Sequence, residues 1–386
     1  MKRREMVAGG IAALGAAAVG GCASRPGLSA DDAALLGFEA DPVFLRRAET
    51  LLRANPAIDV HAHPGRTFIR DAVDLPPTVA ALAASGAFEH RVFEDMRAGR
   101  LCGGSFSLVA DFQVIDFVNG WPAPSRDFHA GEARQSYERQ LANLTRVMVQ
   151  EGAVIARSPS DFRLAKSRGK IAAFLTVEGA DFLAGDIGNV SLAFADGIRS
   201  ITLIHYRPNE LGDNQTSPAL SGGLTPFGAE VIREMDRLGM LVDLAHASEA
   251  TVAAALDVSA RPTMLSHTHL QGRSATNARF ISTELATEVC RRGGVVGAWP
   301  AGIGISSMAE FVDRIMDLAS ILGPEHVSLG TDIDANFRPV FTNYRQLPYL
   351  VSELLRRGYG ESNTIGFVGG NFLRVFEAVW NGRQEQ

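Results

Sequence analysis

Histidines in this sequence gather at the ends of short apolar segments, and this feature restricts the possible folds most strongly. Six of the nine histidines lie at or just after such a segment, and two further apolar segments end in a carboxylate. Continuous apolar runs of this length are typical of buried parallel strands. The residues at these ends are His61, His63, Glu178, His205, His246, His267, His269 and Asp332. Because the carboxyl ends of parallel strands meet at one rim of a barrel, we expect a shared site at its mouth.

Eight predicted strands alternate with helical patterns along most of the chain. One of the clearest helices begins at Thr225-Pro226, an N-cap followed by a first-turn proline, and ends at Gly239. Such alternation predicts an α/β fold, a (β/α)8 barrel of the TIM type, with long loops over its C-terminal face. The longest loop, 111–131, is rich in aromatic residues and proline. The predicted strands are 57–61, 104–110, 171–177, 200–205, 240–245, 262–266, 295–299 and 327–330.

The first residues form a pattern typical of exported proteins. Lys2-Arg3-Arg4 precedes an apolar stretch too short for a stop-transfer helix, and the stretch ends in Gly20-Gly21-Cys22, which resembles a bacterial lipobox. We interpret residues 1–21 as a signal peptide, Cys22 as a lipidated residue, residues 22–45 as a tether and residues 46–382 as the barrel domain. This predicts a lipoprotein on the periplasmic face of a bacterial envelope. The arginine pair leaves Sec and twin-arginine export both open.

Composition limits the partners of the chain. Hydrophobic residues make up 46% of the sequence and charged residues 21%, which permits a large core and excludes the disordered class. Loss of residues 1–21 removes three basic residues and one acidic residue, so the formal net charge changes from −6 to −8. An acidic chain without a long basic run makes nucleic acid an unsuitable partner. We interpret Cys102 and Cys290 as buried free thiols, although an oxidising compartment would allow them to pair.

The residue types at the strand ends are those that bind zinc. His61 and His63 lie two apart on one strand, so their side chains point to the same face. Imidazole and carboxylate are both zinc ligands, and a carboxylate can bridge two ions through its two oxygens. We therefore expect two zinc ions, the first held by His61, His63 and Glu178. The second is held by Glu178, His246 and His267.

Two zinc ions about 3.5–4 Å apart can share a hydroxide that attacks a carbonyl group. Asp332, at the end of the eighth strand, is then the expected proton shuttle between the attacking water and the leaving amine. Metal-bound hydroxide, a proton shuttle and a barrel mouth together predict a hydrolase.

Several short motifs follow one another in a characteristic order between Ile58 and Phe376. Together they resemble the membrane (renal-type) dipeptidases, zinc-dependent members of the wider amidohydrolase group. The motifs are Ile58-Asp59-Val60-His61, Gly103-Gly104-Ser105-Phe106, Val177-Glu178-Gly179, the segment 203–209, the segment 242–248, Ser266-His267, Gly330-Thr331-Asp332 and the segment 370–376.

The resemblance implies roles that agree with the zinc interpretation. Glu178 matches the bridging carboxylate, His246 and His267 match ligands of the second metal, and Asp332 matches the acid/base residue. His205 matches a histidine that contacts the substrate and the developing oxyanion. Arg279 matches the arginine that binds the substrate carboxylate. We also expect Tyr206 and Asn209, which flank His205, to line the substrate pocket.

Three features depart from the family pattern. His63 stands where the family has aspartate, which removes one negative charge and would allow Asp332 to coordinate the first metal directly. Arg279 lies one residue further from His267 than the family spacing, so Arg273 is the alternative carboxylate ligand. His269 has no counterpart, and we interpret it as a loop histidine with a local hydrogen bond.

The resulting hypothesis is a metallo-dipeptidase that accepts a D-residue at the C-terminal position and forms a homodimer, as the resemblance implies. One alternative is another amidohydrolase-type zinc enzyme, acting on N-acyl amino acids or lactones. Another, from a different class, is a substrate-capturing lipoprotein without turnover.

Overall fold

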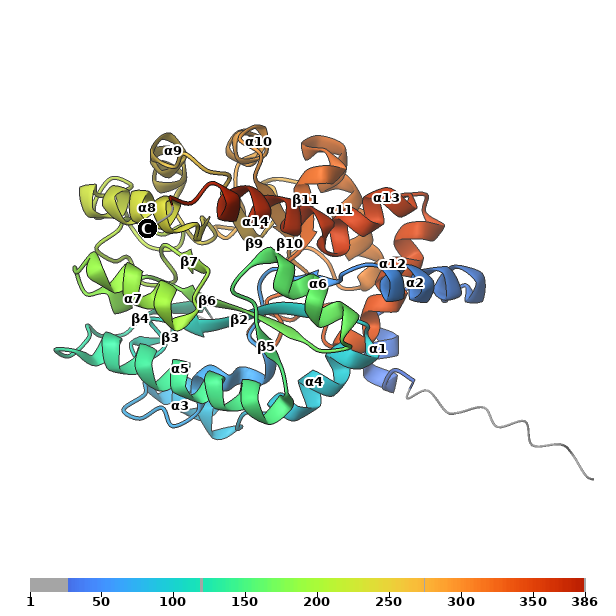
Figure 1. Ribbon diagram of the computed structural model, residues 1–386, viewed down its shortest axis with the longest axis horizontal. Coiled ribbons are helices and arrows are strands. Elements are labelled where there is room, and N and C mark those ends of the chain that lie inside the picture. The colour runs from blue at the N-terminus through green and yellow to red at the C-terminus, as the bar shows by residue number, and fades with distance from the viewer. Residues whose placement is uncertain (1–26, 119–120, 274, 385–386) are drawn as a thin grey trace, which may run out of the picture.

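The computed structural model describes residues 27–118, 121–273 and 275–384, and a parallel β-sheet forms its centre (Figure 1). The barrel strands follow the order β1-β2-β6-β7-β8-β9-β10-β11, so neighbours in space are also neighbours in chain order. Every pair along this path is parallel, which confirms the predicted (β/α)8 barrel. The strands are β1 (Ile58–Asp59), β2 (Gly103–Val109), β6 (Ala172–Glu178), β7 (Ser200–Thr202), β8 (Leu241–Asp243), β9 (Met264–Thr268), β10 (Val295–Ala298) and β11 (Val327–Leu329).

The two ends of the sheet meet and nearly close the barrel. The Val60 N–H donates to the Leu329 carbonyl at 2.9 Å, and a parallel bridge joins Ala62 to Ile333. A short additional strand, β5 (Val154–Ile155), pairs with the beginning of β6. Two residues are too few to produce a recognisable sequence period, which explains why β5 was not predicted.

Several strands end earlier than predicted, because the backbone turns toward the barrel mouth. β7 ends at Thr202 rather than at residue 205, and β11 ends at Leu329 rather than at residue 330. His246 and Asp332 have φ angles of 66° and 54°, a left-handed conformation that a β-ladder cannot accommodate. His246 and Asp332 are therefore in short turns that follow the strands, whereas Glu178 and His267 lie on β6 and β9 themselves.

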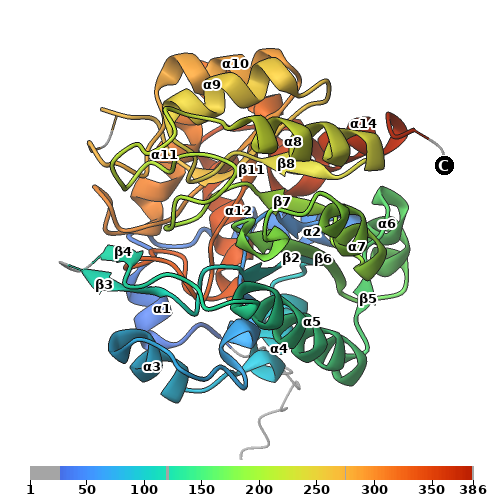
Figure 2. The same cartoon turned by 90° about the vertical axis from the view of Figure 1, so that its left-hand side faces the viewer.

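Helices form an outer layer around the barrel (Figures 1 and 2). The helix predicted after Thr225 is present: the Thr225 side chain accepts the Gly228 N–H at 3.0 Å, and Gly239 ends the helix with φ 76°. The helices are α1 (Ala30–Ala34), α2 (Pro42–Ala54), α3 (Pro77–Ala84), α4 (Glu89–Ala98), α5 (Glu132–Glu151), α6 (Pro159–Ser167), α7 (Gly188–Asp196), α8 (Pro226–Leu238), α9 (Glu249–Val258), α10 (Thr283–Arg291), α11 (Met308–Leu322), α12 (Leu347–Arg356), α13 (Glu361–Ile365) and α14 (Asn371–Asn381).

The long segment after β2 covers one side of the barrel mouth, as predicted. It contains an antiparallel hairpin, β3 (Ile115–Val118) and β4 (Trp121–Pro124), which lies beside α3 in Figure 2. The Trp121 ring stacks on Phe337 from the loop after β11, with ring centroids 5.0 Å apart. Aromatic side chains of two loops thus form part of the wall above the strand ends.

The N-terminal segment differs from the predicted tether. The predicted signal peptide, Cys22 and the residues up to 26 lie outside the described residues, but residues 27–45 pack against the barrel domain. Leu36 is buried, and the Leu35 carbonyl accepts the Met308 N–H at 2.8 Å. Burial of the apolar side chains in this segment explains why it does not extend freely.

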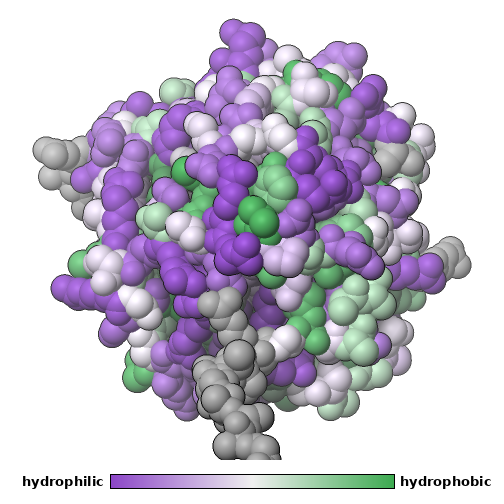
Figure 3. Space-filling view, turned by 90° about the vertical axis from the view of Figure 1, so that its right-hand side faces the viewer, coloured by the Kyte–Doolittle hydropathy of each residue, from purple (hydrophilic) through white to green (hydrophobic). Residues whose placement is uncertain are grey.

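Two further features of the fold concern its surface and its cysteines. On the face shown in Figure 3, hydrophilic residues dominate and apolar ones occur in small groups. Among the described residues, we find no helix with the length and apolar character needed to cross a bilayer. Cys102 and Cys290 are buried free thiols, in agreement with the prediction.

Candidate metal centre and active site

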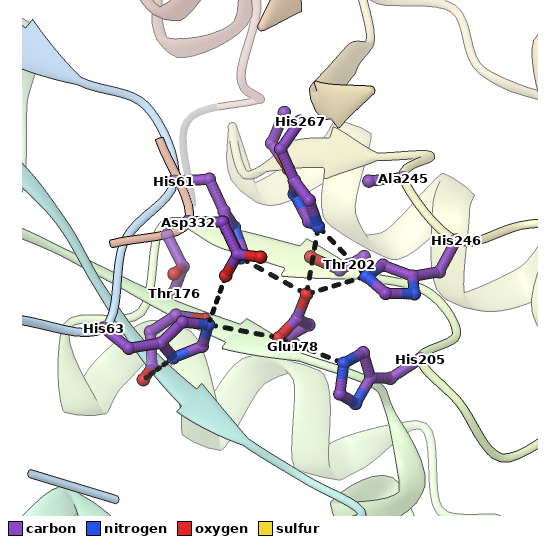
Figure 4. A network of polar contacts seen from close by, with 12 residues as sticks. His61, His63, Thr176, Glu178, Thr202, His205, Ala245, His246, His267 and Asp332 are labelled. Carbon is purple, nitrogen blue, oxygen red and sulfur yellow. Dashed lines mark hydrogen bonds and ion pairs between the residues drawn. The ribbon is translucent and has the colours of Figure 1, made fainter. Parts of the chain in front are cut away.

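Five imidazoles surround the Glu178 carboxylate at the C-terminal rim of the barrel (Figure 4). Glu178 is the last residue of β6, so its side chain enters the mouth from the strand end. Glu178 Oε1 faces the Nε2 atoms of three histidines, and Oε2 faces two. The distances are 3.2 Å to His61, 3.0 Å to His246 and 3.5 Å to His267 for Oε1, and 3.3 Å to both His63 and His205 for Oε2.

The opposite ring nitrogens of three histidines are held in place by neighbouring groups. His63 Nδ1 lies 3.2 Å from the Ser107 carbonyl, and His267 Nδ1 lies 2.9 Å from the hydroxyl of its neighbour Ser266. His205 Nδ1 lies 2.6 Å from Asp111 Oδ1. A carbonyl or carboxylate oxygen at Nδ1 fixes the hydrogen there and directs Nε2 toward Glu178, which is how metal-binding histidines are commonly oriented.

The electrostatics of the cluster depend on Glu178. Burial alone would raise the pKa of Glu178, but the facing His205 and His61 imidazoles hold it well below its usual range. Burial lowers the pKa of His61, and the Glu178 carboxylate outweighs this effect and raises it to about 9. Burial together with the Arg279 charge holds the pKa of His246 well below its usual range. Protonated imidazoles therefore balance the negative charge of Glu178. A metal cation bound at the cluster would displace these protons and balance the same charge.

The donor set fits a metal ion better than it fits a closed hydrogen-bond network. The Nε2 atoms of His61 and His63 are buried without a hydrogen-bond partner among the described residues. The Nε2 atoms of His246 and His267 lie 3.0 Å apart, so two ring nitrogens face each other. Buried polar atoms without a suitable hydrogen-bond partner lower the stability of the fold unless a ligand binds them. Imidazole and carboxylate donors at these positions are suited to zinc.

Donor atoms that lie close enough together to share an ion fall into overlapping groups rather than into two separate sets. Three groups have mutually close donor atoms: His61, Glu178 and His267; His61, His63 and Asp332; and Glu178, His205 and His246. Asp332 Oδ1 lies 3.5 Å from His63 Nε2 and 3.9 Å from His61 Nε2. At this position Asp332 could bind the same metal ion as His61 and His63. This agrees with the expectation that Asp332 coordinates the first metal when histidine replaces the aspartate of the family at position 63.

Asp332 also has a second contact that fixes its orientation. Its Oδ2 accepts the indole N–H of Trp299 at 3.3 Å, while Oδ1 points into the cluster. Burial raises the pKa of Asp332 to about 6. One oxygen thus faces the metal-ligand cluster and the other is anchored by the end of β10.

Arg279 lies in the site, and the alternative Arg273 does not. Arg279 is 1% exposed, and its Nη2 lies 2.9 Å from His246 Nε2 and 3.0 Å from His267 Nε2. Its Nη1 donates to Gln215 Oε1 at 2.5 Å. Arg273 instead forms an exposed ion pair with Asp317 at 2.6 Å. The residue chosen from the family resemblance is therefore the one at the cluster.

Of the two residues expected beside His205, one lines the pocket. The Tyr206 ring packs edge-on against His246 at 4.9 Å and lines the cavity. The prediction for Asn209 is wrong, because its amide donates to the Leu203 carbonyl at 2.9 Å and its oxygen accepts the Leu211 N–H. The Asn209 side chain thus stabilises the loop that follows β7. His269 follows β9 and is buried against Phe280, but the expected local hydrogen bond is not seen, because its Nδ1 has no hydrogen-bond partner among the described residues.

Three residues near the cluster were not assigned to the site from the sequence. Trp299 follows β10 directly and Asp111 lies two residues after the end of β2, so both are strand-end positions like those of the histidines. Asp59 has a structural role: it accepts the Thr331 N–H at 3.0 Å and the Tyr344 hydroxyl at 2.9 Å. Asp59 thereby joins β1 to the turn that carries Asp332.

Known proteins resemble this chain over most of its length. Residues 45–386 match the model of a family described as membrane dipeptidase, peptidase family M19. The dipeptidase aclJ of Aspergillus oryzae is 30% identical over 223 residues, which cover 55% of this chain and 53% of that protein. The chain therefore spans about half the length of this curated relative.

Solved structures share the fold at lower identity. A metallo peptidase from Rhodobacter sphaeroides, liganded with a phosphinate mimic of the dipeptide L-Ala-D-Ala, has a TM-score of 0.72 and 20% identity, covering 84% of this chain and 99% of that one. The probable dipeptidase PvdM from Pseudomonas aeruginosa has a TM-score of 0.71 and 19% identity, covering 89% and 100%. These two structures show the fold alone, whereas the family match over residues 45–386 shows that the chain belongs to the membrane dipeptidase family, peptidase family M19.

Proposed function

We propose that this protein is a metal-dependent dipeptidase that hydrolyses the peptide bond between two residues. The single observation that carries the proposal is the Glu178 carboxylate within 3.0–3.5 Å of five imidazole nitrogens at the barrel mouth. Family membership adds the reaction class, since the family is named for dipeptidase activity.

The chain's own residues supply substrate binding and charge stabilisation. A divalent metal held by the cluster would polarise the scissile carbonyl and lower the pKa of the attacking water. Arg279 offers a planar guanidinium to the C-terminal carboxylate of the substrate, and Gln215 and the Trp299 ring, 5.2 Å from the guanidinium carbon, hold it in position. A protonated His205 carries a hydrogen on Nε2 as well as on Nδ1, and this Nε2–H would donate to the oxyanion that develops on the carbonyl.

Proton transfer is assigned to Asp332. Its Oδ1 faces the centre of the cluster, where it accepts the proton of the attacking water and returns it to the leaving amine. The Trp299 indole holds Oδ2, so the carboxylate does not need to rotate during the reaction. Preorganised groups of this kind reduce the reorganisation that the transition state requires.

The finer features of the enzyme are also proposals. The cluster would hold two zinc ions, since both oxygens of Glu178 face imidazoles: three lie beside Oε1 and two beside Oε2. We assign tolerance of a D-residue at the C-terminal position; the related Rhodobacter sphaeroides structure holds a mimic of L-Ala-D-Ala. From the N-terminal sequence we further propose lipidation at Cys22 and a periplasmic location, and from the family resemblance we propose a homodimer. Mass spectrometry of membrane fractions tests lipidation, and light scattering of the purified protein tests the dimer.

A substrate panel tests the proposed function. Purified protein with added Zn²⁺ is incubated with L-Ala-L-Ala, L-Ala-D-Ala, the tripeptide L-Ala-L-Ala-L-Ala, an N-acetyl amino acid and a lactone. The proposal predicts hydrolysis of both dipeptides and little hydrolysis of the tripeptide. Turnover of only the N-acetyl amino acid or the lactone would assign the site to a different amidohydrolase reaction.

A further inference from the structure

The cavity above the cluster has two chemically different ends. It measures about 230 Å³, and its floor is formed by cluster residues including His63, Glu178 and Asp332. The rest of its wall is almost entirely aromatic or aliphatic. We name this second part the apolar chamber and define it by Phe68, Leu82, Phe112, Ile115, Trp121 and Phe337.

Packing against neighbouring groups fixes most of the chamber wall. The Phe68 and Phe112 rings meet edge-to-face with centroids 4.9 Å apart, and Phe68 also packs against the His63 ring at 5.3 Å. Phe68, Phe112 and Ile115 belong to a small separate core cluster. Such a wall is already formed before a ligand arrives, so little ordering entropy is lost on binding.

The chamber and the arginine that is assigned to the substrate carboxylate are carried by different arcs of the barrel, and they adjoin at Trp299, which packs with Trp121 and Phe337 and lies 5.2 Å from the Arg279 guanidinium carbon. The chamber is built from segments after β1, β2 and β11, together with α3. Arg279 contacts His246 and His267, which follow β8 and lie on β9. A substrate whose carboxylate reaches Arg279 and whose carbonyl lies at the cluster therefore places its amino-terminal residue on the chamber side.

The charges of the chamber restrict that residue further. Outside the cluster, the cavity-lining residues in the described part of the chain include one charged side chain, the exposed Arg338. A lysine or arginine side chain of a substrate would find no carboxylate in the chamber and would lose its hydration. Water against this apolar wall finds few hydrogen-bond partners, and at about 30 Å³ per water the whole cavity of about 230 Å³ holds about eight waters. Their release favours an apolar occupant.

We propose that the apolar chamber selects dipeptides with a large apolar amino-terminal residue, aromatic or branched aliphatic. This inference rests on the proposed dipeptidase function. Full burial of such a side chain corresponds to a preference of about 10- to 100-fold in kcat/KM over glycine. Basic amino-terminal residues fall below glycine, because the chamber offers a cationic side chain no partner.

A series of dipeptides with alanine as the second residue measures the preference. The zinc-loaded enzyme is assayed with Phe-Ala, Leu-Ala, Gly-Ala, Asp-Ala and Lys-Ala, which all share the same α-ammonium group. The expected order places Phe-Ala and Leu-Ala highest and Lys-Ala lowest. Equal kcat/KM across the series, or a preference for Gly-Ala, would overturn the inference.

Two variants locate the preference in the chamber. Leu82→Glu places a carboxylate in the wall, so the ratio of kcat/KM for Lys-Ala over Phe-Ala should rise at least tenfold. Leu192→Glu, at a 52% exposed site on α7, introduces the same charge outside the cavity and serves as the matched control. Phe337→Ala should lose more activity on Phe-Ala than on Gly-Ala. The same change of ratio in the control, or none in either chamber variant, contradicts the assignment.

A binding measurement separates this inference from the proposed function. If no dipeptide is hydrolysed, the proposed function fails, but the chamber can still be tested with amino-acid amides that mimic the amino-terminal half. The chamber inference predicts that L-Phe-amide and L-Leu-amide raise the Tm of the protein more than Gly-amide or L-Lys-amide do. Equal shifts with all four amides would overturn the chamber inference independently of turnover.

Discussion

The contact between Asp111 and His205 allows a quantitative prediction about catalysis. Asp111 is fully buried, accepts from His205 Nδ1 at 2.6 Å and accepts the Arg207 backbone N–H at 3.0 Å. Burial lowers the pKa of His205, but the Asp111 and Glu178 carboxylates outweigh it and raise the pKa. Asp111→Asn keeps the size and an acceptor oxygen but removes the charge. Hydrogen bonds to charged groups are worth about 1.5–3 kcal/mol and neutral ones about 0.5–1.5.

The difference, about 1–2 kcal/mol, corresponds to a decrease of about 5- to 30-fold in kcat if His205 stabilises the transition state. The assay compares kcat, KM, bound metal and Tm for the wild type and Asp111→Asn. Asp313→Asn, at a side chain 69% exposed on α11, is the matched control and should behave as the wild type. Unchanged kcat in Asp111→Asn would refute the positioning role. If Asp111→Asn lost bound metal together with activity, His205 would be a metal ligand instead. The structure is compatible with that role, because the donor atoms of His205, Glu178 and His246 lie close together.

Three further variants test other parts of the site and the fold. Asp332→Asn should retain bound metal and lose about 10²- to 10⁴-fold in kcat, as expected for loss of a general acid/base; metal loss would identify its main role as a ligand. Arg279→Ala should mainly raise KM for dipeptides with a free carboxylate and affect dipeptide amides much less. Arg273→Ala is its control, and an equal rise in KM there would contradict the geometry of the site. Gly297→Ala would bring a Cβ within 1.7 Å of a backbone oxygen of β9, so we expect a loss of about 1–3 kcal/mol and a lower Tm. An unchanged Tm would show that the strands can separate at this point.

The strand-end histidines made much of the site predictable. Parallel strands require apolar runs because both faces are covered, and the residue after each run must lie at the same rim. That logic alone brought His61, His63, Glu178, His246 and His267 together before the structure was considered. The family resemblance added the role of Arg279, which neither periodicity nor residue spacing could supply.

Other features depend on side-chain partners that a sequence pattern does not contain. Asn209 lies close to His205 in sequence, yet its side-chain amide forms hydrogen bonds with backbone groups of its own loop. The apolar chamber joins α3, the β3–β4 hairpin and the loop after β11, which are far apart in the chain. The left-handed φ angles of His246 and Asp332 are a further feature that only the folded backbone shows.

The measurement that tests the central claim most directly is metal analysis of the purified protein coupled to dipeptide hydrolysis. We predict two divalent ions per chain, loss of activity after exhaustive chelation and recovery on addition of Zn²⁺. Glu178→Ala should lose both the ions and the activity, because every imidazole of the cluster faces its carboxylate. Full dipeptide hydrolysis by metal-free protein, or an unchanged metal content in Glu178→Ala, would contradict a metal centre organised around Glu178.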